Sequence, residues 1–533
     1  MRLQVTLPFG VHPPWVRKHF PAPRAGYHSP HADLPRGASS VLTYASNFSR
    51  RLSGQFFQLL TAQRALLVCV LGGAFLVTLR CAPLIASPYQ IDYGEGLMID
   101  GGLRIRHSQP LYPNPFAFPV VLHVYGPVAY AATAAILPDG KASFPAGRFL
   151  ILICSVTLSL LIGTILRRAT GSWWIGLSFG FLLLTLPAFR FWLYLLRADV
   201  IGVLFSLTGI TLYLLNEKRW YWSVPLFGLA LFCKYSLLAA PVAVFVHMIL
   251  KREARRGCLF AAGLGTASTL AFLVLQSRTG GWFAFHMFST HPDRYALTQF
   301  LALGALVTGG APVVTALAAW YAALDFRTRK GGFPPIYLAA SSLTSLTAGK
   351  LGSTTNHFVE WMVACCICAG LGYSLFLSKH PARTRQMTLL LSVSILAGII
   401  AGNQSRLQPS RELAECGSAY QYVSNSPSSR VLSESLGPLL VAGKPILVSD
   451  PFVYDQFVKQ RSWPDRRVEE LLNERYFDLI VMSYDPSQMK THVSDVWLGP
   501  MGTAIERNYR SVRQFNCRDA RVMLEPAEPN LDH

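Results

Sequence analysis

The stretch AGRFLILICSVTLSLLIGTIL at residues 146–166 decides the fold class, and Arg167 and Arg168 follow it directly. A helix of about 20 apolar residues is long enough to cross the hydrocarbon core of a bilayer. Similar runs recur along the chain, which has 533 residues, 51% of them hydrophobic and 14% charged. Soluble domains carry about 25% charged residues. The sequence therefore predicts a polytopic α-helical membrane protein.

Hydropathy predicts about eleven transmembrane helices. The expected spans are 64–86, 146–166, 173–190, 198–215, 220–233, 235–250, 257–276, 299–323, 333–350, 356–377 and 386–402. Residues 220–250 have one long helix as an alternative, and segment 123–137 is expected to lie in the outer interface. Basic clusters fall in alternate connections, which is typical of cytoplasmic loops. We therefore expect a multi-pass protein of the plasma membrane with a cytoplasmic N-terminus and an extracytoplasmic C-terminus.

The net charge of +20 follows from the same basic clusters. Because they sit at the ends of apolar segments, they indicate membrane topology and not nucleic-acid binding. Residues 1–50 are rich in Pro, His, Arg, Gly and Ser and cannot form a core. We expect a disordered basic tail over residues 1–63, either a cytoplasmic segment or one added by a misplaced start codon.

The pattern changes after residue 402, where the chain no longer shows long apolar runs. VLSES at 431–435 and FDLIVMS at 477–483 predict short buried strands, and PDRRVEELLNERY at 464–476 predicts an amphipathic helix between them. This alternation is typical of a small α/β domain, expected over residues 403–533 and outside the membrane. We expect it to cover the pocket or to help bind the acceptor.

Two cysteines, Cys416 and Cys517, lie in this C-terminal region. Cysteines in an oxidising compartment often pair, but a sequence does not give the distance between them. The sequence is therefore compatible with a disulfide between Cys416 and Cys517 and also with two free thiols.

Acidic residues gather in the first outer loop, expected at 87–122, which begins SPYQIDYGEGLMIDGG. Asp92, Glu95 and Asp100 follow the first span closely, where a carboxylate is costly unless it is solvated or functional. One interpretation is a solvated loop with turn glycines. The other is a set of functional acids.

Further ionisable residues fall on the same side of the membrane in the predicted topology. Each has an ordinary alternative: Lys234 could extend its side chain to the interface, and His357 could lie at a helix end. Their convergence on one side predicts a polar pocket at the outer membrane surface. The predicted members are Asp199, Lys234, His286, His291, Arg294, Lys350, His357 and Glu360.

The order of motifs resembles that of the GT-C membrane glycosyltransferases. The acidic first loop is followed by PLYPNP at 110–115, HVYGPVAYAATAAI at 123–136 and LRAD at 196–199. The nearest branch is the one related to glycosyltransferase family 39, with the protein O-mannosyltransferases and aminoarabinose transferases. The resemblance covers roughly residues 64–402. It departs from the family pattern in one place, where the tandem Asp-Glu is replaced by Asp92-Tyr-Gly-Glu95.

The resemblance implies a polyprenyl-phosphate sugar as donor. The sugar would pass, usually with inversion, to a hydroxyl of a glycolipid, glycan or protein acceptor. Such a transfer needs a carboxylate that takes the proton of the attacking hydroxyl. Asp92 is the first candidate for this base and Glu95 the second.

The resemblance also implies positive charge beside the departing lipid phosphate, for which Lys234 and Arg294 are the candidates. Asp199 would orient the acceptor or hold a divalent metal. His357 and Glu360 have suitable ligand types for that metal but no recognisable spacing.

Two other classes compete with this interpretation. A transporter or lipid flippase would also carry intramembrane charge, but would more often show repeated halves and broken helices at mid-membrane. A non-catalytic scaffold that displays the C-terminal domain is the third hypothesis.

Overall fold

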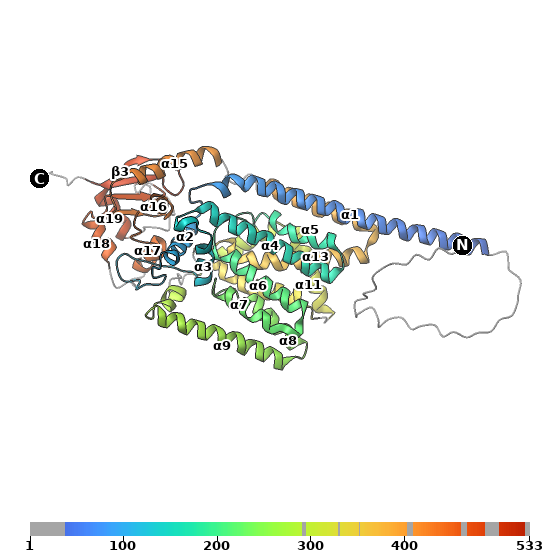
Figure 1. Ribbon diagram of the computed structural model, residues 1–533. Helices are drawn as coiled ribbons and strands as arrows, with labels where there is room; N and C mark the ends of the chain where they lie inside the picture. The colour runs from blue at the N-terminus through green and yellow to red at the C-terminus, as the bar shows by residue number, and fades with distance from the viewer. Residues whose placement is uncertain are drawn as a thin grey trace. The chain divides into compact units, whose positions relative to one another are not determined.

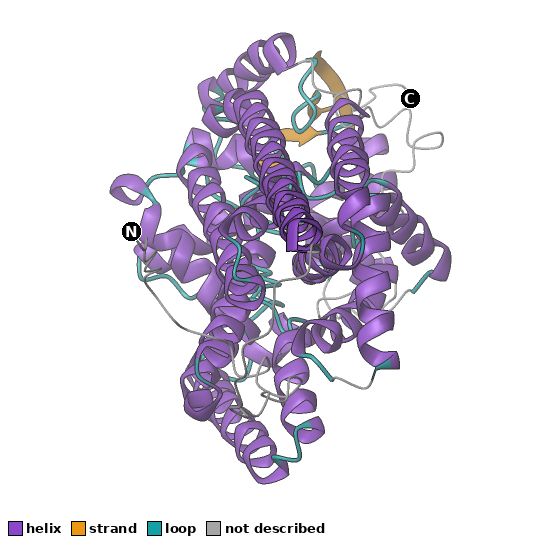
Figure 2. Ribbon diagram, turned by 90° about the vertical axis from the view of Figure 1, so that its right-hand side faces the viewer, coloured by secondary structure: helices purple, strands orange, loops and turns teal. Residues whose placement is uncertain are grey.

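The computed structural model describes residues 38–289, 295–328, 331–350, 352–401, 409–459, 466–484 and 500–527. The chain divides into two compact units, residues 1–56 and 57–533. All the site residues that the structure describes belong to the second unit. Helices make up most of the described chain, as Figure 2 shows.

The helical part is built from α1 to α14. The long helices are α1 (Ala38–Ala86), α4 (Phe144–Thr170), α6 (Ala198–Leu215), α9 (Ala254–Arg278), α13 (Val359–Lys379) and α14 (Thr384–Ala401). Shorter ones are α2 (Tyr93–Arg106), α3 (Pro127–Ile136), α5 (Trp173–Thr185), α7 (Ser223–Leu231), α8 (Ala239–Leu250), α10 (Leu297–Gly309), α11 (Pro312–Arg327) and α12 (Phe333–Thr344). Helix α1 begins at Ala38, within the segment that composition assigned to a disordered tail, and residues 1–37 lie outside the described chain.

Six described helices are long and apolar enough to cross a membrane, or seven if the bent pair α10 and α11 is one span. Several predicted spans are shorter or broken: the two spans expected over 220–250 are the short helices α7 and α8, so the alternative of one long helix was wrong, and 299–323 bends by 98° between α10 and α11. The predicted total of eleven spans therefore stays a prediction. The chain is a multi-pass α-helical membrane protein.

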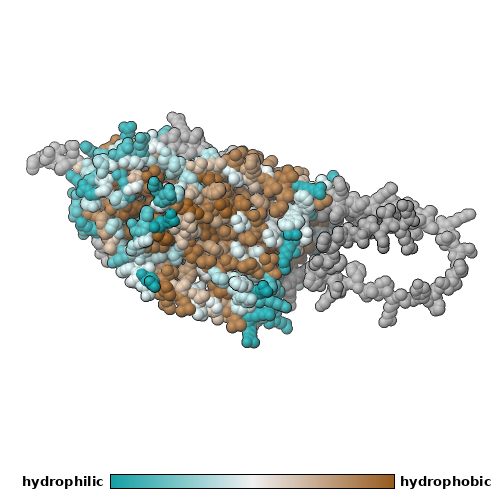
Figure 3. Space-filling model, viewed as in Figure 1, coloured by the Kyte–Doolittle hydropathy of each residue, from teal (hydrophilic) through white to brown (hydrophobic). Residues whose placement is uncertain are grey.

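The outer surface of the helices is apolar, as a surface in contact with lipid should be. Large side chains such as Val68 (72% exposed), Leu343 (67%) and Ile400 (59%) point outward. Figure 3 shows an apolar belt on this face with hydrophilic residues at its two ends. A soluble protein would not expose so continuous an apolar surface.

The first predicted loop, residues 87–122, does not begin as a solvated loop, and that interpretation was wrong at this point. Residues 93–106 form helix α2, and Gly94 and Gly96 are buried in its first turn. Asp92 caps the helix, and Glu95 completes a capping box by accepting from the backbone of Asp92. The short apolar segment expected at 123–137 is helix α3.

The C-terminal region contains a four-stranded sheet in the order β1-β2-β4-β3. Its strands are β1 (Val431–Ser433), β2 (Leu479–Met482), β3 (Tyr509–Gln514) and β4 (Val522–Pro526). The β1–β2 pair is parallel, and the β2–β4 and β3–β4 pairs are antiparallel. The helices beside it are α15 (Pro409–Asn425), α16 (Gly437–Ala442), α17 (Pro451–Lys459), α18 (Arg467–Asn473) and α19 (Pro500–Asn508).

The two predicted strands are present as β1 and β2, and the predicted helix between them contains α18, although Pro464 lies outside the described residues. Strands β3 and β4 were not predicted. Cys416 and Cys517 form a disulfide that joins α15 to the turn after β3. The alternative of two free thiols was therefore wrong.

The C-terminal elements meet the chain that follows α2, as Figure 1 shows. Val120 N donates to Leu447 O at 2.9 Å, and Ser449 N donates to Val120 O at 3.0 Å. This short parallel bridge connects segments more than 300 residues apart in sequence. The chain between α2 and α3 is thus joined to the C-terminal region.

Candidate active site

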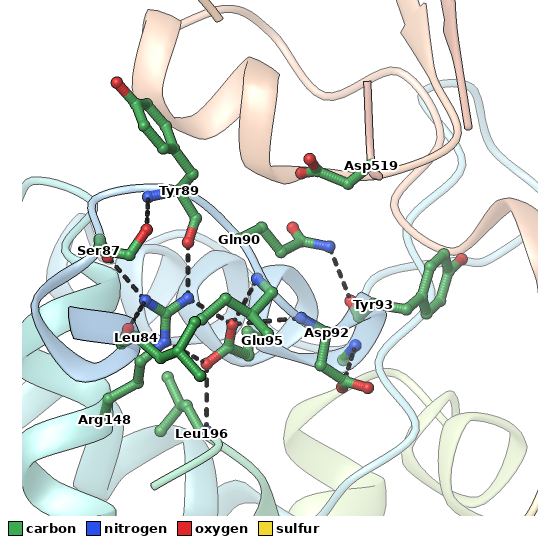
Figure 4. A network of polar contacts seen from close by, with 12 residues as sticks. Leu84, Ser87, Tyr89, Gln90, Asp92, Tyr93, Glu95, Arg148, Leu196 and Asp519 are labelled. Carbon is green, nitrogen blue, oxygen red and sulfur yellow. Dashed lines mark hydrogen bonds and ion pairs between the residues drawn. The ribbon is translucent and has the colours of Figure 1, made fainter. Parts of the chain in front are cut away.

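A buried ion pair fixes the start of α2 (Figure 4). Glu95 and Arg148 are both 0% exposed, and Arg148 donates to Oε1 at 2.8 Å and to Oε2 at 2.7 Å. The same guanidinium donates to the carbonyl oxygens of Leu84, Ser87 and Tyr89. Arg148 therefore ties the chain after α1 to the first turn of α2. This favours a structural role for Glu95 over that of a base.

Asp92 lies beside this ion pair but is partly open to solvent. Its Oδ2 accepts from Gly94 N at 3.0 Å and lies 2.6 Å from Arg197 Nη2. The side chains of Asp92 and Arg197 are 27% and 18% exposed. Arg197 also donates to Tyr125 OH at 2.7 Å. Within the described chain no residue hydrogen-bonds to Asp92 Oδ1, so this oxygen can take a proton from an incoming hydroxyl.

Gly94 allows this arrangement because Arg197 lies directly on it. A Cβ atom at position 94 would lie 2.2 Å from Arg197 Cζ. We expect Gly94→Ala to displace Arg197. The rate of the reaction in which Asp92 takes a proton from a hydroxyl should then fall by roughly tenfold. The matched control is Gly72→Ala in α1, where an added Cβ meets nothing within 4 Å. Equal rates for both variants would show that Arg197 does not position Asp92.

A second ion pair lies at the same end of α6. Lys234 Nζ is 2.6 Å from Asp199 Oδ1, and Asn356 Nδ2 donates to the same oxygen at 3.1 Å. Asp199 is 2% exposed, and its Oδ2 has no hydrogen-bond partner among the described residues. Arg197 precedes Asp199 by two positions at the start of α6. The predicted residues Asp92, Asp199 and Lys234 therefore meet around the N-terminal end of one helix.

Other predicted members of the pocket have structural partners of their own. His357 Nδ1 is 2.7 Å from Thr347 Oγ1. Glu360 Oε1 accepts from Ala240 N at 3.1 Å and from Tyr337 OH at 3.3 Å, which fixes the start of α8. Glu360 is therefore occupied by contacts between helices.

Of three further members of the predicted pocket, the structure describes only Lys350. The backbone of Lys350 forms an isolated antiparallel bridge with Tyr295. His291 and Arg294 lie outside the described residues, so their predicted roles stay predictions.

The suggested metal ligands do not assemble into a site. Among the described residues, the ligand atoms of Asp199, His357 and Glu360 do not gather within 4.8 Å of one another. The described group whose ligand atoms do lie within 4.8 Å of one another includes Cys416 and Cys517. The sulfur atoms of these two cysteines are bonded to each other. Lys234 places a cation against the carboxylate of Asp199. Asp199, His357 and Glu360 therefore do not form a metal site in the described chain.

His286 belongs to a separate buried cluster on the far half of α2. Its Nδ1 accepts from His123 N at 3.2 Å, and its Nε2 is 2.9 Å from Pro113 O. Burial lowers the pKa of His286 to about 4, so the ring is neutral near pH 7. His123 Nε2 is 3.4 Å from Asp100 Oδ2, and burial raises the pKa of Asp100. This cluster packs the loop before α3 against α2.

The C-terminal region supplies a residue that the sequence analysis missed. Asp450 Oδ1 accepts from Tyr93 OH at 2.8 Å and from Val453 N at 3.0 Å. Burial raises the pKa of Asp450 to about 6. Asp450 therefore fixes Tyr93, the neighbour of Asp92, to the start of α17 in the C-terminal region. No local pattern around Asp450 indicated this contact.

Arg148 and Arg197 were missed as well, although both had a signal in the sequence. Arg148 lies in the apolar run 146–166, and a charge in such a run needs a buried partner. Arg197 belongs to the LRAD motif, in which only Asp199 was singled out.

Comparison with known proteins gives no match to a protein-family profile and none to a curated sequence. The structure is similar to the crystal structure of ArnT from Cupriavidus metallidurans in the apo state, with a TM-score of 0.56 and 11% identity over 85% of this chain and 96% of that one. The same protein bound to undecaprenyl phosphate gives a TM-score of 0.56 and 12% identity over 86% and 97% of the chains. This likeness confirms the resemblance in the sequence at the level of the fold: the chain has the fold of the GT-C membrane glycosyltransferases.

Proposed function

We propose that this protein is a glycosyltransferase that moves a sugar from a polyprenyl-phosphate donor to an acceptor hydroxyl. The observation that carries the proposal is the meeting of Asp92, Arg197 and the Asp199–Lys234 pair at the start of α6. Its support includes the likeness to ArnT, which binds undecaprenyl phosphate. The acceptor classes are a glycolipid, a glycan or a protein.

The proposed reaction is a single displacement at the anomeric carbon. Asp92 Oδ1 takes the proton of the acceptor hydroxyl while its oxygen attacks. The bond between the anomeric carbon and the phosphate oxygen breaks, and the lipid phosphate leaves with the electron pair. One displacement inverts the anomeric configuration. Arg197 orients Asp92. Arg197 and Lys234, the cations at the start of α6, stabilise the charge of the leaving phosphate.

We place this site on the outer side of the plasma membrane. The basic clusters at the opposite ends of the helices support that orientation. The C-terminal sheet would then lie outside the membrane, where its disulfide would be stable.

Lys234 is the proposed contact for the donor phosphate, but it also neutralises Asp199. We expect Lys234→Met to weaken donor binding by roughly tenfold, because a charge-assisted hydrogen bond is lost. The measurement is the Kd for a polyprenyl phosphate in detergent.

The double variant Lys234→Met/Asp199→Asn separates the two roles of Lys234. It leaves no unpaired buried charge, so it should fold better than the single variant. If Lys234 binds phosphate, the double variant still binds weakly. Full recovery of donor affinity would show that Lys234 serves only Asp199.

The proposed function is tested by incubating purified protein with labelled polyprenyl-phosphate sugars and hydroxyl acceptors of the three classes. We expect a labelled product with one acceptor class and release of the lipid phosphate. Donor binding without transfer to any acceptor of these classes would contradict the proposal.

A further inference from the structure

A cavity of about 270 Å³ lies among the helix ends on the side remote from Asp92. Arg168 lines it near the end of α4, whereas Arg148 holds the candidate active site near the start of the same helix. The two arginines are 20 positions apart in one helix, so about 30 Å separates them along its axis. The cavity therefore lies at the opposite membrane surface and is independent of the proposed function.

The walls of the cavity are apolar. Ile165, Leu214, Phe333 and Leu371 line it. The buried His247, which also lines the cavity, has its Nδ1 2.7 Å from the hydroxyl of Tyr213. An apolar chain therefore suits the interior better than a polar solute.

The mouth of the cavity carries positive charge. Arg168 is exposed and donates through Nη2 to Leu215 O at 3.1 Å, and its other donors have no partner among the described residues. Glu217 also lines the cavity, but Lys251 Nζ lies 2.5 Å from its Oε2 and neutralises it. The free charge at the entrance is therefore that of Arg168.

The surroundings place this entrance at the lipid–water boundary. Exposed aromatic residues follow Glu217, with Tyr221 51% and Trp222 57% exposed, and such residues are enriched at membrane interfaces. In Figure 3 a hydrophilic patch over the turn between α8 and α9 borders the apolar belt. Further cations in the chain after α6 and α8 are Lys218, Arg219, Arg252, Arg255 and Arg256. Anionic lipids are attracted to such clusters.

We propose that this cavity binds an anionic phospholipid, with one acyl chain between the helix ends and the phosphate on Arg168. The apolar walls accept the chain, and the free donors of Arg168 match phosphate oxygens. The excess of positive charge disfavours a zwitterionic headgroup relative to an anionic one.

The test is native mass spectrometry of the full chain titrated with dioleoylphosphatidylglycerol or dioleoylphosphatidylcholine. We expect saturable binding of the anionic lipid. Arg168→Gln should weaken it by roughly fivefold. Arg167→Gln, on the same turn of α4, should leave it unchanged, because Arg167 does not line the cavity and lies over the ring of Trp173.

Leu214→Trp tests the acyl-chain site, because the larger side chain fills the cavity. We expect this variant to lose saturable binding while thermal unfolding in phosphatidylcholine shows that it folds. Three results would overturn the proposal: equal loss in both arginine variants, unchanged binding in Leu214→Trp, or full competition by glycerol phosphate without acyl chains. If Leu214→Trp does not fold, the two arginine variants decide the question.

Discussion

Replacing Asp92 by asparagine is expected to lower the rate of sugar transfer by roughly 10²-fold or more, with donor binding retained. Asparagine keeps the shape of the side chain and caps a helix nearly as well as aspartate. The start of α2 should therefore stay in place while the oxygen that takes the proton loses its basicity. The measurement is kcat for transfer together with the Kd for the donor.

The control is Asp139→Asn, because Asp139 is an exposed acid with a left-handed backbone that asparagine also adopts. It should leave both quantities unchanged. If Asp92→Asn were fully active and Glu95→Gln inactive but stably folded, Glu95 would be the base. The assignment within Asp92-Tyr-Gly-Glu95 would then be wrong.

Replacing Arg148 by methionine is expected to lower the free energy of unfolding by about 3–5 kcal/mol. The variant leaves the carboxylate of Glu95 buried without its cation, and three carbonyl oxygens of the preceding chain lose their donor. Denaturant-induced unfolding in detergent measures the change.

Two controls separate the buried ion pair from a general effect of removing an arginine. The double variant Arg148→Met/Glu95→Gln should recover part of the stability, because no charge is left unpaired. Arg167→Met, at the exposed end of the same helix, should cost about 1 kcal/mol or less. A loss in Arg148→Met no larger than in Arg167→Met would show that the buried pair does not hold the site.

The fold class could be predicted from the sequence because apolar runs of membrane length leave little choice of structure. The number of spans could not. Hydropathy does not show where an apolar run breaks, as α10 and α11 do at a bend of 98°. The length of a helix is also uncertain from hydropathy, since the span predicted at 220–233 is helix α7, which has only 9 residues.

The start of α2 was predicted as a loop, although its sequence carried a helix signal. Asp92 and Glu95 have the three-residue spacing of a capping box, whereas Gly94 and Gly96 are typical of a turn. Position 94 has no room for a side chain, because the guanidinium of Arg197 packs against Gly94. A single sequence does not show such a contact.

The candidate site was predicted in part. Asp92, Asp199 and Lys234 meet as expected because their segments all lie at one end of the helices. Glu360 looked equivalent in sequence but bonds to the backbone of Ala240. Asp450 could not be predicted, because its contact with Tyr93 joins residues 357 positions apart.

The most direct test of the proposed function follows a labelled polyprenyl-phosphate sugar in proteoliposomes that contain the protein and an acceptor. Scission of the bond between sugar and phosphate and passage of the intact lipid across the bilayer are measured in the same sample. We expect one lipid phosphate released for each sugar transferred, and no scission with Asp92→Asn. Passage of the intact donor without scission would contradict the proposal and indicate a flippase.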